Sequence, residues 1–202
     1  MSRSGSTVIR ATIKESASAP SSVSQSEMSF RVVGQTSGSV GGQASAGQED
    51  IYLSKLDALG KVVFTTQVGS LNGGVDGGYS VALGQDNSIY ITGYVGQSIN
   101  DQVAQGETDA VVMKFNADGS KAWVKSFGTT YFDAGNALAI AANGHIFVTG
   151  VLSNGYGGDA IVKGYTEVTR HPQAFLAEFD PSGTSVSIRT TATTPLPESG
   201  TA

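Results

Sequence analysis

Apolar residues alternate with polar or small residues in short runs along most of this 202-residue chain. The pattern is clearest over residues 108–150, which hold four apolar runs separated by turn-forming segments: residues 111–115, 122–124, 137–140 and 146–148. Alternation with a period of two is typical of β-strands, and frequent turn residues indicate hairpin connections. We therefore expect residues 108–150 to form the four antiparallel strands of one structural unit.

The same four-strand pattern occurs upstream, over residues 49–93, so the chain contains an internal repeat. Equivalent glycines of successive copies lie 57 or 59 residues apart: Gly34, Gly93 and Gly150, and likewise Gly60 and Gly119. A near-constant period of this length indicates repeated supersecondary units. No window sustains the spacing of an amphipathic helix, and Gly recurs too often for one. The expected fold is therefore all-β.

Three of the expected hairpin turns have Asp or Asn in the first position and Gly in the last: residues 57–60, 116–119 and 180–183. The first side chain can accept hydrogen bonds from the backbone of its own turn, and glycine adopts the left-handed conformation without strain. This pattern predicts a type I turn closed by a glycine bulge.

The repeat sets the expected domain organisation. Residues 1–28 form a Ser-rich N-terminal segment with one strand of an incomplete unit at residues 7–13, residues 29–192 form the repeat region, and residues 193–202 form a flexible tail. A third copy carries an enlarged loop at residues 155–172 before it resumes. When the expected strands are matched in order to the four strands of the unit, the first and the last strand of the chain each correspond to a second strand. The chain therefore contains about three units.

The recurring residues, D-[AI]-x-x-x-K-[FL]-[ND]-x-x-G and [ND]-[GN]-x-I-[FY]-[VI]-T-G, resemble the bacterial seven-bladed β-propeller repeat and the related repeats of about sixty residues in large surface proteins. The likeness covers residues 29–187 and is strongest over residues 50–150. It implies propeller-type blades of four antiparallel strands, in bacterial proteins that are often large, exported or attached to the cell surface. Most members of this family have no assigned catalysis.

About three blades are fewer than the four to eight of a closed propeller. Three arrangements follow: a fragment of a longer propeller, a ring completed by further copies, or an open array. Bare terminal strands invite pairing with another strand. The expected partner is therefore a protein or a second copy bound through the terminal strands. The C-terminal hairpin at residues 174–191 is also expected to close a blade with the N-terminal strands of the same chain or of a neighbour.

Charged residues make up 14% of the chain, and the net charge is −5. Nucleic-acid binding needs a basic surface, so this class of ligand is disfavoured. The chain has no Cys, which excludes disulfides and thiolate metal sites. No apolar run has the length of a membrane-spanning helix, and no signal peptide is evident. The low charge and the Gly/Ser/Thr-rich composition suit an extracellular or cell-surface protein.

The candidate ligand-binding residues lie in loops and at strand starts: Asp76, Asp133, Asp159, Tyr79 and Tyr156. Asp76 and Asp133 occupy matching loop positions, and loops of this kind can gather at one rim of a propeller. Tyrosines and Trp123 suit either a sugar-stacking surface or, more often for strand aromatics, packing between blades. Glycine-rich loops with Asp and free carbonyl groups suit Ca²⁺, although no cofactor is expected. His145 and His171 are too few for a zinc site.

Motifs of serine hydrolases, zinc proteases and P-loop NTPases are absent from the sequence, so no catalytic residue is expected. The leading interpretation is a non-catalytic structural or interaction module of a bacterial surface or extracellular assembly, which binds through inter-strand loops. The alternative is a carbohydrate-binding module or a propeller-type lyase or glycosidase, with a glycan as its ligand.

Overall fold

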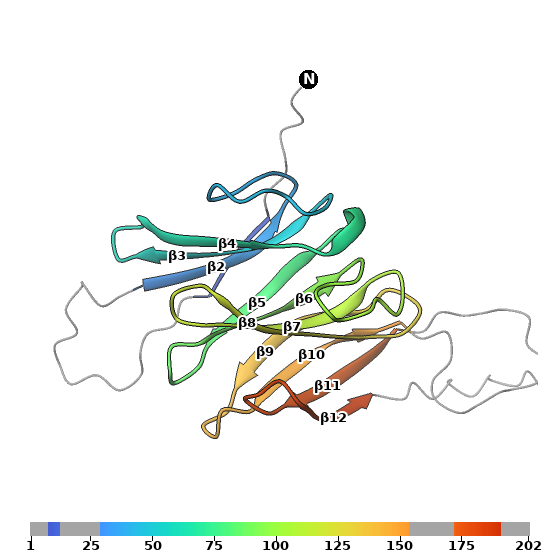
Figure 1. Ribbon diagram of the computed structural model, residues 1–202. Helices are drawn as coiled ribbons and strands as arrows, with labels where there is room; N and C mark the ends of the chain where they lie inside the picture. Colours follow the sequence, from blue (N-terminus) through green and yellow to red (C-terminus); the bar gives the residue numbers. More distant parts are fainter. Residues whose placement is uncertain (1–7, 13–28, 154–171, 191–202) are drawn as a thin grey trace, which may run out of the picture.

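The computed structural model describes residues 8–12, 29–153 and 172–190, which form twelve β-strands (Figure 1). Apart from a 3₁₀ turn at Leu71–Gly73, the described residues contain no helix. Each successive group of four strands forms one antiparallel sheet, in which neighbours in the chain are neighbours in space. The prediction of an all-β fold of antiparallel sheets is thus confirmed.

Sheet 1 consists of β1 (Val8–Thr12), β2 (Ser29–Thr36), β3 (Asp50–Asp57) and β4 (Val62–Val68). Sheet 2 consists of β5 (Gly77–Leu83), β6 (Ile89–Val95), β7 (Asp109–Phe115) and β8 (Lys121–Phe127). Sheet 3 consists of β9 (Ala134–Ile140), β10 (Ile146–Leu152), β11 (Gln173–Phe179) and β12 (Ser185–Thr190). Sheet 2 lies between the other two (Figure 1).

Residues 108–150 contain four strands as predicted, but these strands belong to two sheets rather than one. β7 and β8 complete sheet 2, whereas β9 and β10 begin sheet 3. The error is one of phase, because a period gives the length of a repeat but not the strand at which a sheet begins. The hairpin connections stay within a sheet, and the links after β4 and β8 pass to the next sheet.

The two ends of the described strands also differ from the expectation of incomplete units. β1 is the first strand of sheet 1, and β12 is the fourth strand of sheet 3. The C-terminal hairpin does not pair with β1, because β11 and β12 complete the sheet begun by β9 and β10. The enlarged loop expected at residues 155–172 and the tail at residues 193–202 lie outside the described residues, except for Pro172.

Two apolar clusters fill the spaces between sheets. The first joins sheets 1 and 2 and includes Ile51, Leu53, Val111, Met113 and Phe115. The second joins sheets 2 and 3 through residues of β6, β7, β10 and β11, with Trp123 and Phe127 of β8 packed against it. Sheet 2 therefore buries both of its faces, and nearly every side chain of β7 is inaccessible to solvent. Packing of Trp123 between sheets agrees with the structural role expected for it.

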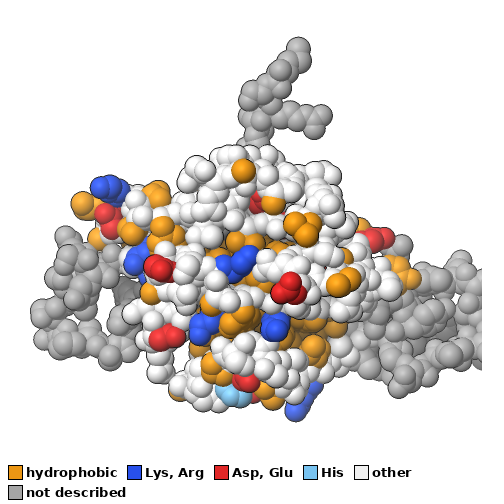
Figure 2. Space-filling view, in the orientation of Figure 1, with side chains coloured by type: hydrophobic (Ala, Val, Ile, Leu, Met, Phe, Trp, Pro, Cys, Tyr) orange, Lys and Arg blue, Asp and Glu red, His pale blue; other side chains and the backbone are white. Residues whose placement is uncertain are grey.

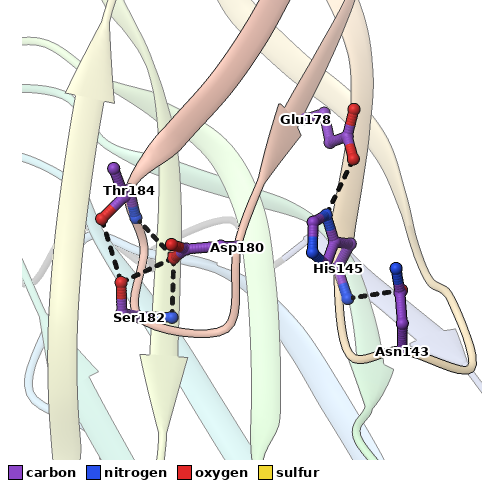
Figure 3. Close-up of polar contacts among 6 residues, drawn as sticks. All are labelled: Asn143, His145, Glu178, Asp180, Ser182 and Thr184. Atoms are coloured by element: carbon purple, nitrogen blue, oxygen red, sulfur yellow. Dashed lines mark hydrogen bonds and ion pairs between the residues drawn. The ribbon is translucent and has the colours of Figure 1, made fainter.

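The three predicted Asp/Asn-to-Gly turns have the expected geometry. Gly60, Gly119 and Gly183 have φ values of 78°, 87° and 85°. A bulge follows in each hairpin, where the strand register shifts by one residue. Figure 3 shows the third turn, in which Asp180 accepts hydrogen bonds from the backbone N–H groups of Ser182 and Thr184.

Two of these turns also join neighbouring sheets. A Cβ atom at Gly119 would lie 2.5 Å from the ring of Phe64 on β4, and the Gly119 carbonyl accepts a 2.8 Å hydrogen bond from Thr66. A Cβ atom at Gly183 would lie 3.0 Å from Trp123 on β8. Each turn thus rests on an aromatic side chain of the preceding sheet. Gly60, in the turn of sheet 1, has nothing within 4 Å of its Cβ position.

Substitution of Gly119 by Ala should therefore destabilise the protein more than substitution of Gly60. Both changes place a Cβ at a positive φ, which costs about 1–2 kcal/mol. Only Gly119→Ala also drives an atom into Phe64, which adds about 1–3 kcal/mol of overpacking. Urea denaturation of the two variants measures the difference, and equal losses of unfolding free energy would contradict the proposed contact between sheets.

Candidate functional site

Four aspartates lie buried at the junctions between sheets, each at most 1% exposed: Asp50, Asp76, Asp109 and Asp133. Two of them are the first residues of β3 and β7. The other two end the links that lead into β5 and β9. They form two equivalent pairs, Asp50 with Asp76 between sheets 1 and 2, and Asp109 with Asp133 between sheets 2 and 3.

The backbone aligns each pair in the same way. The Asp76 N–H donates to the carbonyl of Glu49 at 2.9 Å, and the Asp133 N–H donates to the carbonyl of Thr108 at 2.9 Å. Short parallel bridges accompany these bonds at both junctions. The carbonyl that accepts each bond belongs to the residue immediately before Asp50 or Asp109, so this pairing brings the two aspartates of each pair side by side.

Asp76 and Asp133 each accept three hydrogen bonds that tie the link to the sheet it enters. Asp76 accepts from the backbone N–H of Ser70 at 2.5 Å, from its hydroxyl at 2.7 Å and from the N–H of Gly96 at 3.0 Å. Ser70 is the second residue of the link after β4, and Gly96 follows β6. The equivalent donors to Asp133 are the N–H and hydroxyl of Thr129 and the N–H of Ser153.

Asp50 and Asp109 are bound through one carboxylate oxygen only. Oδ2 of Asp50 accepts from the N–H of Ala46 at 2.8 Å and from Nε2 of Gln67 at 2.7 Å. Oδ2 of Asp109 accepts from the N–H of Gln105 at 2.9 Å. The Oδ1 atoms of both aspartates are buried and have no hydrogen-bond partner among the described residues.

A glycine lies against the unpartnered oxygen at each junction. A Cβ atom at Gly128 would lie 2.6 Å from Asp109 Oδ1 and 2.4 Å from Asp133 Oδ2, so these two oxygens are within about 5 Å of each other. A Cβ atom at Gly69 would lie 1.9 Å from Asp50 Oδ1. Only glycine leaves room for the carboxylates at these positions.

The burial of these carboxylates opposes their ionisation. Burial raises the pKa of Asp76, and the charge of Asp50 raises it further, against the lowering effect of the Ser70 and Gly96 donors. Burial likewise raises the pKa of Asp109, which the Gln105 N–H lowers and the charge of Asp133 raises. Each junction is therefore a place where a positive charge or a proton is stabilised.

The structure does not bring the expected ligand-binding residues together as one open rim site. Asp76 and Asp133 belong to different pairs, and both are buried rather than open to solvent. Tyr79 is half-buried on β5, with its ring centroid 5.3 Å from that of Tyr94. Burial, followed by the neighbouring Tyr79, raises the pKa of Tyr94 to about 12. Asp159 and Tyr156 lie outside the described residues.

Sequence reasoning did not single out Asp50 and Asp109, although both are the first residue of the recurring D-[AI]-x-x-x-K pattern. The available signal was their separation of 59 residues, the period of the repeat, together with links that each begin with a glycine, Gly69 or Gly128, and end in a second aspartate. The third copy departs from this pattern, because β11 begins with a buried Gln173 at the equivalent position.

Other polar groups of sheet 3 have structural partners. Nδ1 of His145, the residue before β10, lies 2.7 Å from Oε1 of Glu178 on β11 (Figure 3). His171 lies outside the described residues. Among the described residues, no group of three or more His, Cys, Asp or Glu side chains is placed to hold a metal ion. The described part of the chain also holds no helix long and apolar enough to span a membrane.

Comparison with known proteins gives one partial likeness. No family model matches the sequence. The chain is similar to a protein named regulatory protein FlaEY from Caulobacter vibrioides, with 28% identity over 132 residues. The match covers 61% of this chain but only 13% of the length of that protein.

The raised pKa values predict how stability depends on pH in metal-free buffer. The stability contribution of Asp109 is greatest below its unfolded-state pKa near 3.9 and is lost as the pH rises through its higher folded-state value. An amide at this position carries no charge, and its NH₂ group would face Asp133. We therefore expect Asp109→Asn to become increasingly stable relative to the wild type between pH 4 and pH 7.

Asp118→Asn is the matched control, because a hydrogen bond from the Ser120 side chain lowers the pKa of this exposed turn carboxylate. Its contribution has the opposite sign, since it is present above the unfolded-state pKa and is lost as the pH falls through the folded-state value. Urea denaturation across the pH range measures both differences. A pH-independent difference for Asp109→Asn would show that this carboxylate is not destabilised by its burial.

Proposed function

We propose that this chain is a non-catalytic structural or interaction module built of propeller-type blades, which serves a bacterial surface or extracellular assembly. The way the sheets meet supports the blade arrangement. β5, the first strand of sheet 2, lies against β1 and β2 of sheet 1 and against β9, the first strand of sheet 3. The sheets thus approach one another along their first strands, as blades do around a propeller axis.

The functional proposal concerns the side of sheet 3 that faces away from sheet 2. The two junctions between sheets share an aromatic residue on the fourth strand, Phe64 or Trp123, and an aspartate at the start of the third strand. Sheet 3 has Ser187 and Gln173 at these positions. Sheet 3 therefore lacks both the aromatic residue and the aspartate that the next sheet contacts at the other two junctions. We infer that sheet 3 is suited to a contact of a different kind.

The strand β12 offers such a contact. It pairs with β11, and no other described strand pairs with its second edge. Val186 and Ile188 on this strand are 53% and 43% exposed. An edge strand with exposed apolar side chains can pair with a strand of another molecule. We infer that a protein partner, in the simplest case a second copy of this chain, binds along β12.

The burial of the aspartates weighs against the alternative of a carbohydrate-binding module or a propeller-type lyase or glycosidase. A glycosidase needs carboxyl groups that reach its substrate, whereas Asp76 and Asp133 are buried and hold the links. The face seen in Figure 2 carries acidic and basic side chains scattered among apolar ones rather than a patch of one sign. We therefore place binding at the sheet edge and leave a glycan ligand as the secondary proposal.

Sedimentation velocity of the full chain over a range of concentrations tests the edge-strand proposal. We expect concentration-dependent association in the wild type. Substitution of Val186 and Ile188 by Lys should weaken self-association at least tenfold with little loss of stability, because charged residues protect an edge and both positions are exposed.

Leu59→Lys is the control, because Leu59 is 93% exposed in the turn of sheet 1, away from β12. If Leu59→Lys weakened self-association as much as the β12 substitutions, the association would be non-specific and apolar. A wild-type chain that remains monomeric at all concentrations would overturn self-association through β12.

A further inference from the structure

We propose that each of the two carboxylate pairs, Asp50 with Asp76 and Asp109 with Asp133, binds one calcium ion. This inference does not depend on the proposed interaction through β12. It rests on the packing of the two sheet junctions, where the same arrangement of carboxylates occurs twice in one chain.

The first observation is that the negative charge of the buried carboxylates is not fully compensated. At the junction of sheets 2 and 3, Asp133 accepts three hydrogen bonds, whereas Oδ1 of the buried Asp109 accepts none from the described residues. This oxygen lies within about 5 Å of Asp133 Oδ2. Two buried carboxylates at this separation repel each other, and an unpartnered charged oxygen away from water carries a large desolvation penalty. A bound cation removes both penalties.

The donor set indicates which cation fits. Both side chains of each pair offer oxygen, which is the ligand atom that calcium prefers. Calcium binds oxygen at about 2.3–2.6 Å, so one ion can contact two oxygens up to about 5 Å apart. Its tolerance for irregular coordination suits links that add backbone carbonyls and water to two carboxylates, whereas magnesium demands near-octahedral geometry. Two carboxylates also balance the charge of one divalent ion.

The junction of sheets 1 and 2 repeats the pattern of hydrogen bonds and of an unpartnered oxygen among the described residues. Asp76 accepts three hydrogen bonds, and Oδ1 of the buried Asp50 again has no partner in the described part of the chain. The charge of Asp50 acts on Asp76, and their backbones are joined through Glu49. Sheet 3 begins its third strand with Gln173 and therefore lacks the first carboxylate of such a pair. The expected stoichiometry among the described residues is two ions per chain.

Isothermal titration calorimetry with calcium chloride, on full-length protein freed of metal with EDTA, tests this count near neutral pH. The wild type should bind two ions, Asp50→Asn and Asp109→Asn one each, and the double variant none. Calcium at about 100 times its dissociation constant should raise the midpoint of thermal unfolding by several degrees, because selective binding to the folded state stabilises it. Magnesium at the same concentration should have a much smaller effect.

Asn has the shape of Asp, and a cooperative melting transition establishes that each variant is folded. Asp118→Asn serves as the control for loss of one negative charge, and it should keep both ions. Absence of binding at millimolar calcium would overturn the proposal and assign a shared proton to each pair. Binding that survives in the double variant would overturn it equally, because the ion would then lie elsewhere.

Discussion

The hydrogen bonds that Asp76 and Asp133 accept are the constraint on which the stacking of the sheets depends. Each carboxylate joins the start of a link to the end of the second strand in the next sheet. The link after β4 is rich in glycine, and Leu71, Val75 and Phe132 of the two links are exposed side chains that do little to fix their course. Without these carboxylates the buried N–H groups of both segments would lose their acceptors, at a cost of about 1–3 kcal/mol each. The direction in which the chain enters each new sheet is therefore set by a side chain.

A second contact between neighbouring sheets lies at a distance from the links. The turn glycines Gly119 and Gly183 rest on Phe64 and Trp123 of the preceding sheet, and the apolar clusters lie between this contact and the carboxylates. Two separated contacts determine the angle between neighbouring sheets, which the apolar cluster alone, being non-directional, would leave less well defined. Because the glycine belongs to the later sheet and the aromatic residue to the earlier one, the stack has a direction.

Much of this fold could be predicted from the sequence because its signals are local. Alternation of apolar residues located the strands, and Asp or Asn followed by Gly located the turns. The phase of the sheets could not be predicted in the same way. Whether the link after β8 makes a hairpin or crosses to a new sheet depends on contacts such as that between Asp133 and Thr108, which are 25 residues apart. The pairing of Asp109 with Asp133 was missed for the same reason.

The presence of a second carboxylate at each junction requires its own explanation. Asp76 and Asp133 suffice to hold the links, since each accepts three hydrogen bonds. Among the described residues, Asp50 and Asp109 accept hydrogen bonds only through Oδ2, from the neighbouring loop and, for Asp50, also from Gln67 of β4. An amide oxygen would serve this role equally well. Gln173 shows that a buried amide side chain is accommodated at this position in the third sheet. An amide would also present a donor where Oδ1 of Asp50 and of Asp109 has no partner among the described residues. Stability of the loops alone therefore favours Asn or Gln, and the two aspartates are better explained by the binding of a positive charge.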